Sequence, residues 1–218
     1  MTKLTCVAAL VACTACSAIP AVSTLRDKAL VGLGNVTGLN PSTPEPAGPA
    51  IPTDALAKGP GNVLMVTLMA RNAVAAMTRV GSNNGVDTWR TAKGVTLSFK
   101  DGILVASRGL NEDLIGADLI GVHAAIVAGT GTSQRRHSFL DSEDQLQIRE
   151  MDCEVTTDGP EEIVTVAGAT AAIKVTEVCT GQPFAFTNNY WLDEIGGEIL
   201  QSQQALARTT GFIKVNPL

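Results

Sequence analysis

The five cysteines carry the most reactive side chains of this 218-residue sequence, and they fall into two groups. Cys6, Cys13 and Cys16 lie near the N-terminus, whereas Cys153 and Cys179 lie in the last third of the chain. A thiol can be lipidated, oxidised to a disulfide or bound to a metal, and the sequence around it favours one of these uses. The two groups of cysteines predict two different chemistries.

The first group lies in a segment with the layout of a secretory signal. Lys3 supplies a positive charge, Leu4 to Ala12 is a short apolar run, and small residues follow it. That run is far shorter than the roughly 20 residues that a membrane-spanning helix needs. Leu10-Val11-Ala12-Cys13 resembles a lipobox, the site where bacteria attach lipid to a cysteine before cleavage, and Cys16 is a second candidate. Residues 1–15 are therefore predicted to be a lipoprotein signal peptide, with cleavage before Cys13 or Cys16.

The residue after each lipidation candidate predicts where the protein is sorted. Thr14 follows Cys13 and Ser17 follows Cys16. Neither is the aspartate that retains lipoproteins at the inner membrane in enterobacteria. We therefore expect a protein that its N-terminal lipid anchors in the outer membrane, facing the periplasm.

Export determines the chemistry expected of the second group. Because the periplasm is oxidising, Cys153 and Cys179 are predicted to form a disulfide. Neither belongs to a CxxC motif, and a zinc site would need histidines nearby, of which the sequence has only His123 and His137. Both cysteines fall on predicted strands, and a bridge requires that these strands pair directly or that the sheet curls. No metal or cofactor is expected.

Aromatic residues make up only 4% of the chain, so Trp89, Tyr190 and Trp191 are notable. Aromatic faces stack on sugar rings, and large aromatics also anchor cores. A two-residue turn at Gly196-Gly197 would place Trp191 opposite Ser202 and Tyr190 opposite Gln203. Glu177 shares a face with Cys179, and a carboxylate near a core requires a partner. The predicted cluster, either a binding site or a structural anchor, consists of Trp89, Glu177, Tyr190, Trp191, Ser202 and Gln203.

Signals for catalysis and for nucleic-acid binding are weak. The two histidines lie in the least regular part of the sequence, without a nucleophile elbow, and no carboxylate pair indicates glycoside hydrolysis. We therefore predict a protein that is not an enzyme. A net charge of −5 argues against nucleic-acid binding, and Arg135-Arg136, the only adjacent basic pair, is interpreted as a solvated strand or loop end.

The elements that position these residues are predicted to be strands, because apolar residues alternate with polar ones through most of residues 62–218. Asp101-Gly102 is the strongest hairpin signal, with Phe99 opposite Leu104 and Leu97 opposite Ala106. Asp158-Gly159-Pro160 predicts a turn between two further strands, and residues 111–127 a helix. We expect a mainly β fold, a single antiparallel meander curved into a barrel-like or half-barrel domain with one or two short helices. Residues 17–61 are predicted to form a short helix and a Pro-rich arm.

A series of short motifs, taken in order, resembles one protein family. They are Arg79-Val80-Gly81, Asp87-Thr88-Trp89, Asp101-Gly102-Ile103-Leu104-Val105, Ser107-Arg108-Gly109-Leu110 with Asp113, Cys153, Glu177-Val178-Cys179, Phe186, Asn189-Tyr190-Trp191, Ser202 and Gln203. The family is the YjbF/GfcB group of bacterial lipoproteins, which is associated with exopolysaccharide production and capsule formation. The similarity runs from about Val63 to the C-terminus. It implies a β-rich, barrel-like domain on a periplasm-facing outer-membrane lipoprotein, and the family pattern assigns no catalytic residues.

The resemblance implies an accessory factor in exopolysaccharide or capsule secretion or assembly. Such a factor would act as a non-catalytic binding module, with polysaccharide or other secretion proteins as its partners. Two alternatives remain open. A lipid- or lipoprotein-carrying half-barrel would enclose an apolar cavity, and a periplasmic hydrolase acting on polysaccharide would bring carboxylates together in a cleft.

Overall fold

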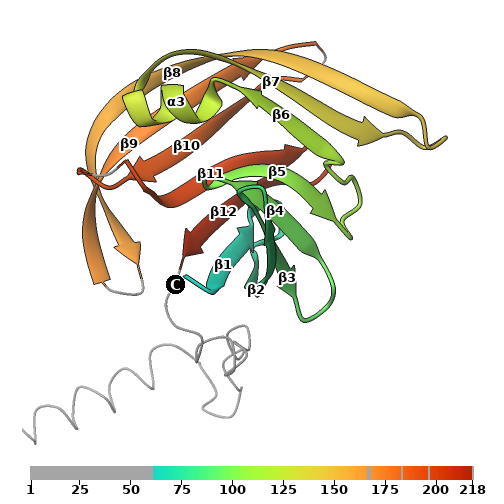
Figure 1. The fold of residues 1–218 in the computed structure, drawn as a ribbon, viewed down its shortest axis with the longest axis horizontal. Helices are drawn as coiled ribbons and strands as arrows, with labels where there is room; N and C mark the ends of the chain where they lie inside the picture. The colour runs from blue at the N-terminus through green and yellow to red at the C-terminus, as the bar shows by residue number, and fades with distance from the viewer. Residues whose placement is uncertain (1–60, 166–167, 183, 196, 218) are drawn as a thin grey trace, which may run out of the picture. The chain divides into compact units, whose positions relative to one another are not determined.

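Period-two alternation of apolar residues dominates the sequence after Gly61, and this part of the protein accordingly consists of strands (Figure 1). The computed structural model describes residues 61–165, 168–182, 184–195 and 197–217, which belong to one compact unit. The lipidation candidates Cys13 and Cys16, the signal peptide and the Pro-rich arm lie outside the described residues.

The described residues form twelve strands, one α-helix and one short 3-10 helix. The strands are β1 (Val63–Leu68), β2 (Ala73–Asn83), β3 (Val86–Thr91), β4 (Thr96–Lys100), β5 (Ile103–Arg108), β6 (Gly116–Ile120), β7 (Thr130–Leu140), β8 (Leu146–Thr165), β9 (Gly168–Thr180), β10 (Phe186–Leu192), β11 (Ile199–Ala207) and β12 (Gly211–Pro217). The helices are η1 (Met69–Arg71) and α3 (Val122–Ala128).

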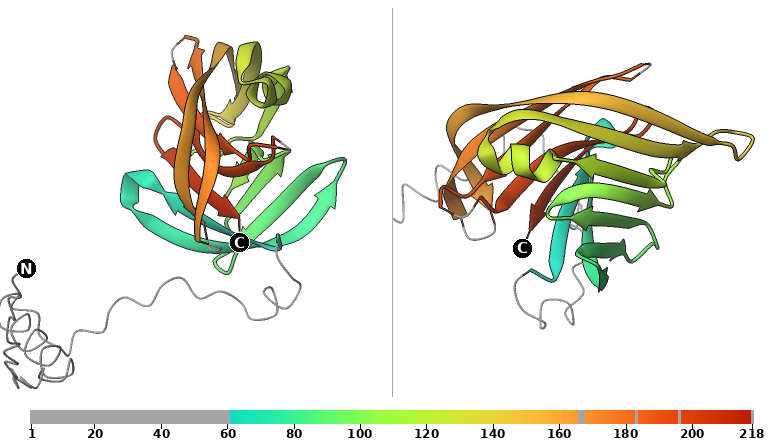
Figure 2. Two further views of the ribbon diagram at one scale, coloured as in Figure 1. Left: turned by 90° about the vertical axis from the view of Figure 1, so that its left-hand side faces the viewer. Right: turned by 45° about the horizontal axis from the view of Figure 1, so that its top comes forward.

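All twelve strands belong to one antiparallel sheet, with the order β5-β4-β3-β2-β1-β12-β11-β10-β9-β8-β7-β6. The sheet is nearly closed into a barrel, which confirms the predicted fold class (Figures 1 and 2). The first and last strands pair with each other, so the two ends of the meander meet inside the sheet. The two free edges therefore belong to β5 and β6, which are consecutive in the chain.

The inward face of the sheet carries the core. Leu64, Met77, Trp89, Phe99 and Ile213, from five different strands, belong to one buried cluster. A second cluster lies under α3, whose buried residues Val122, Ala125 and Ile126 pack with Ile103, Val155, Tyr190 and Leu192. The helix thus covers part of the interior.

The helix predicted over residues 111–127 is mostly wrong. Residues 116–120 form strand β6, and only Val122–Ala128 is helical. Gly121 and Gly129, with φ angles of 73° and 66°, begin and end this helix in the left-handed conformation. Such a conformation favours glycine and limits the helix to two turns.

The Asp101-Gly102 turn is confirmed, but its register is only half right. Both turn residues have positive φ angles, 50° and 76°, as a type I′ hairpin turn requires. Phe99 faces Leu104 as predicted. A register shift between Ser98 and Phe99 then places Leu97 opposite Ser107 instead of Ala106. A bulge of this kind adds one residue to one strand and moves every later pair.

The turn predicted at Asp158-Gly159-Pro160 is wrong. These residues lie inside β8, a strand of 20 residues, and the register with β9 shifts between Thr157 and Gly159. The Gly-Pro signal therefore marks a bulge, where an irregular backbone interrupts the ladder without reversing the chain. As a result, β8 pairs directly with the whole of β9, from Asp152 opposite Thr180 to Thr165 opposite Gly168.

A buried glutamine on β11 bonds one end of the free edge of β5. The Leu104 backbone N–H donates to Oε1 of Gln204 at 2.9 Å, and Nε2 of Gln204 donates to the Gly102 carbonyl at 2.9 Å. The amide of this β11 residue therefore bonds the free edge of β5 as the peptide group of a neighbouring strand would. Gln204 is only 1% exposed, so its bonds form away from water.

The loop between β5 and β6 holds the other end of β5. The Asp113 carboxylate accepts hydrogen bonds from Ser107 Oγ at 3.0 Å and from the backbone N–H groups of Gly109 and Leu110 at 2.8 and 3.1 Å. Arg108 donates to the Leu114 carbonyl at 3.0 Å. The motif Ser107-Arg108-Gly109-Leu110 with Asp113 is thus the joint between the two edge strands.

The glutamine that bonds the edge of β5 should be important for stability. We expect Gln204→Leu to lower the free energy of unfolding by about 1–3 kcal/mol, because the buried Leu104 N–H loses its acceptor. Gln203→Leu, on the opposite face of the same strand, should change it by at most about 0.5 kcal/mol. Urea unfolding of both variants measures the difference, and equal effects would contradict this role of Gln204.

Candidate functional site

The six residues predicted to form one cluster lie in different places. Glu177 and Tyr190 belong to a buried charge network, whereas Trp89 and Ser202 line an open cleft. Trp191 packs with Ile163, in a cluster that includes neither Tyr190 nor Trp89. Gln203 faces Asn189 across the ladder between β10 and β11.

The predicted pairing between β10 and β11 is wrong by one residue. Tyr190 faces Ser202, and Trp191 faces Gln201. The expected two-residue turn does not form, because β10 ends at Leu192 and β11 begins at Ile199. Successive strand residues point to opposite faces, so the side chains of Tyr190 and Trp191 diverge.

The buried charge network joins three strands through one carboxylate. Glu177 on β9 accepts two hydrogen bonds from Arg135 on β7, from Nε at 2.9 Å and from Nη2 at 2.8 Å. On β10, Asn188 Nδ2 donates to the same carboxylate at 2.8 Å, and the Tyr190 hydroxyl donates to it at 3.3 Å. All four side chains are at most 3% exposed.

The polar groups of this network stabilise one another. Burial acts to lower the pKa of the Arg135 guanidinium, but Tyr190 and Glu177 outweigh burial and raise it. Burial raises the pKa of the Tyr190 hydroxyl. The guanidinium therefore stays charged and the phenol stays neutral, so the network is a fixed ion pair. With its carboxylate bonded on all sides and shielded from solvent, it serves the fold.

Asn188 and Arg135 are the two network residues that were not predicted from the sequence. Arg135 belongs to the adjacent basic pair. Its neighbour Arg136 fits the interpretation as a solvated residue, because it pairs with Glu150 at 2.8 Å on an exposed face. Arg135 points the other way, as strand alternation requires, and is buried. The requirement that Glu177 have a partner was the available signal, and an adjacent basic pair on a strand necessarily offers one inward residue.

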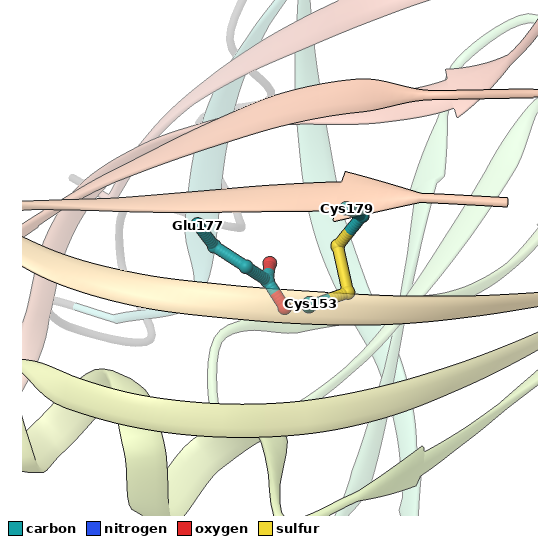
Figure 3. A group of neighbouring side chains, drawn as sticks. All are labelled: Cys153, Glu177 and Cys179. Carbon is teal, nitrogen blue, oxygen red and sulfur yellow. A yellow bond between two sulfur atoms is a disulfide. The ribbon is translucent and has the colours of Figure 1, made fainter.

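The predicted disulfide between Cys153 and Cys179 is present. The two residues face each other directly on β8 and β9, with 4.0 Å between their Cα atoms. The strands that carry them pair directly, which is one of the two arrangements that the sequence analysis left open. Glu177 lies beside the bridge (Figure 3). Ligand atoms of these three residues lie within 4.8 Å of one another, but the sulfurs are joined and the carboxylate is held by Arg135.

His137 lies in the core near this network. It is 2% exposed and stacks on Phe186 with 5.8 Å between ring centroids. Within the described part of the chain, neither ring nitrogen has a hydrogen-bond partner. Burial, and then the charges of Arg135 and Arg149, lower the pKa of His137 to about 3. The ring is therefore neutral at physiological pH.

An open cleft of about 630 Å³ lies on the inner side of the sheet. Its lining includes Arg79, Asp87, Trp89, Phe99, His123 and Ser202. Arg79 and Asp87 form an ion pair at 3.6 Å, and the Arg79 guanidinium lies 6.0 Å from the centre of the Trp89 ring. This cleft combines apolar surface with partly exposed polar groups, an arrangement that suits binding of a small or extended polar ligand.

Comparison with known families identifies the chain. The model of the family described as "Group 4 capsule polysaccharide lipoprotein gfcB, YjbF" matches residues 39–218. The chain belongs to this family. Membership confirms the resemblance found in the sequence and associates the protein with capsule polysaccharide and with a lipid anchor. No curated protein matches the sequence significantly.

A solved structure shows the same fold. The chain is similar to the hypothetical lipoprotein YmcC from Escherichia coli (K12), with a TM-score of 0.63 and 14% sequence identity. The similarity covers 72% of this chain and 85% of YmcC. Among the described residues, no helix is both long enough and apolar enough to cross a membrane.

The buried ion pair should be strongly coupled. We expect Arg135→Met to lower the free energy of unfolding by about 3–5 kcal/mol, because the Glu177 carboxylate remains buried without its counter-charge. The double variant Arg135→Met/Glu177→Leu should recover part of this loss. Arg136→Met, which breaks the exposed pair with Glu150, should cost at most about 1 kcal/mol. Denaturant titrations test this, and an equal cost for both arginines would refute the coupling.

Acid should destabilise the protein through His137. The unfolded histidine binds a proton below about pH 6.5, while the folded residue does not until about pH 3. Its contribution to stability is therefore complete above pH 6.5 and decreases as the pH falls, by at most about 1.4 kcal/mol per pH unit.

The window from pH 6.5 to 5 isolates this effect, because most carboxylates are still ionised there. Melting curves should show a smaller decrease for His137→Leu than for the wild type. The exposed His123→Leu is the control and should follow the wild type. A wild-type stability that does not change over this window would contradict the prediction.

Proposed function

We propose that this protein is an outer-membrane lipoprotein that assists exopolysaccharide or capsule secretion or assembly by binding, without catalysing a reaction. Family membership supports the association with capsule polysaccharide. Binding is favoured over catalysis because the buried charge network around Glu177 and the open cleft are separate sites. The preorganised charged groups are sealed in the core, and the open cleft holds solvated ones.

The cleft favours a binding module over a lipid carrier. A carrier of lipid needs an apolar cavity, but Arg79, Asp87 and Ser202 contribute polar groups to this cleft. Other inward residues are buried, with Phe139, Ile126 and Leu206 at most 1% exposed.

A polysaccharide hydrolase is the second candidate, because three carboxylates, from Asp87, Asp101 and Glu198, line the cleft. A general acid in a glycosidase needs a raised pKa, which burial usually provides. Asp101 and Glu198 are exposed, and Asp87 is paired with Arg79. Binding is therefore the better supported function, and release of reducing ends from the polymer by the purified protein would favour the hydrolase.

Deletion and complementation test the proposal. Deleting the gene should reduce secreted polysaccharide, and the wild-type gene should restore it. Labelled palmitate should enter the wild-type protein and be absent from Cys13→Ser/Cys16→Ser, which should not restore secretion because its anchor is lost. Cys6→Ser is the matched control and should be labelled and active. Unchanged polysaccharide in the deletion strain would refute the proposed function, and persistent labelling of the double variant would refute the anchor.

A further inference from the structure

We propose that the cleft lined by Trp89, Arg79 and Asp87 is a saccharide site that takes an uncharged stretch of the polymer. This inference rests on the proposed function and adds the place and the chemical class of the ligand. The cleft volume of about 630 Å³ lies within the range of roughly 300–1,000 Å³ that is usual for small-ligand sites.

A sugar ring has apolar C–H faces and polar hydroxyl groups, and the cleft offers a matching surface for each. Leu64, Trp89, Phe99 and Val215 form the apolar floor of the cleft, each with 5–6% of its surface exposed, and this floor faces the apolar C–H side of a ring. Asp87 and Arg79 provide an acceptor and a donor for hydroxyl groups. These surfaces come from β1, β2, β3, β4 and β12, so the site is built on paired strands.

The polar side chains on one wall are already held in place. Arg79 is fixed from three directions, by the Asp87 carboxylate at 3.6 Å, by Asn62 Oδ1 at 3.1 Å and by the Trp89 ring at 6.0 Å. A site whose polar groups are ordered before binding loses less conformational entropy when the ligand arrives. Arg79 and Asp87 remain 40% and 35% exposed, so both keep free hydrogen-bonding capacity toward the cleft.

The charges of the cleft select against acidic sugars. The described lining carries one full positive charge, on Arg79, and three carboxylates, on Asp87, Asp101 and Glu198. Arg79 is already neutralised by Asp87. A uronic acid or a phosphate would therefore meet a net negative surface, whereas neutral hydroxyls accept hydrogen bonds from Arg79 and donate them to the carboxylates. A lipid chain would leave these groups without partners.

Calorimetric titration with defined oligosaccharides tests the inference. The probes are neutral glucan, galactan and mannan hexasaccharides and an acidic oligogalacturonate of the same length. We expect at least one neutral probe to bind at least tenfold more tightly than the acidic probe. In a Trp191→Phe background, Trp89 is the remaining tryptophan, so its fluorescence should change on binding.

Matched variants locate the site. Asp87→Asn and Arg79→Gln should weaken binding of the neutral probe at least tenfold. Glu150→Gln and Arg136→Gln, which alter the exposed ion pair between β7 and β8, should bind as the wild type does. Melting temperatures within a few degrees of the wild type show that the cleft variants are folded. The affinity of any one folded cleft variant for the neutral probe is enough to test the site.

The outcomes separate this inference from the proposed function. Tighter binding of the acidic probe, unchanged binding by both cleft variants, or no binding of any probe would each overturn the saccharide site. In the deletion strain, the cleft variants should fail to restore secretion. Full restoration by a cleft variant would overturn the site and leave the proposed function intact, whereas an unaffected deletion strain would remove the function itself.

Discussion

The structure depends on one constraint, that a carboxylate inside a β-barrel must find all its partners within the barrel. Glu177 meets this requirement with groups from β7 and β10. Asn188 extends the network to a further strand, because its Oδ1 accepts the Ala205 backbone N–H at 2.8 Å. That N–H lies at the register shift between Ala205 and Ala207 on β11. One charge thus connects four strands and fixes a bulge that would otherwise leave a buried donor unpaired.

Side chains also complete the barrel where the backbone ladder stops. The order of the strands leaves β5 and β6 as edges, and an open edge exposes a row of unpaired peptide groups. Gln204 bonds one end of the β5 edge, and the Asp113–Ser107–Arg108 joint closes the other. Glu112 ties the loop between β5 and β6 to the rest of the barrel, because it accepts from Arg149 on β8 at 3.2 Å and from Thr209 Oγ1, between β11 and β12, at 2.9 Å. These side-chain contacts hold the edges of the curved sheet, so a short loop is enough to connect β5 to β6.

The sequence predicted the local features of this fold and missed the distant ones. Alternation and the Asp101-Gly102 turn depend on neighbouring residues, so the strands and the hairpin could be inferred. Bulges at Ser98/Phe99 and Trp191/Leu192 shift the register by one residue, and no simple local signal marks them. The partner of Glu177 is 42 residues away and the partner of Leu104 is 100 residues away. The first pair joins β7 and β9 across β8, and the second joins β5 and β11, so both depend on the curvature of the sheet, which the sequence pattern does not determine. The cleft was missed for the same reason, since Trp89 and Ser202 meet only when β1 pairs with β12.

The residues that carry the family resemblance divide according to their positions. Ser107, Asp113, Glu177, Cys179 and Tyr190 shape the barrel, through the joint, the ion pair and the disulfide. Arg79, Asp87, Trp89 and Ser202 line the cleft. The first group is buried, whereas Arg79 and Asp87 are partly exposed at the open side of the barrel. Trp89 also belongs to the core, but the ion pair between Arg79 and Asp87 is partly exposed and worth little to stability. A solvated pair of this kind, held against the indole of Trp89, supports the proposal that this part of the barrel binds a ligand.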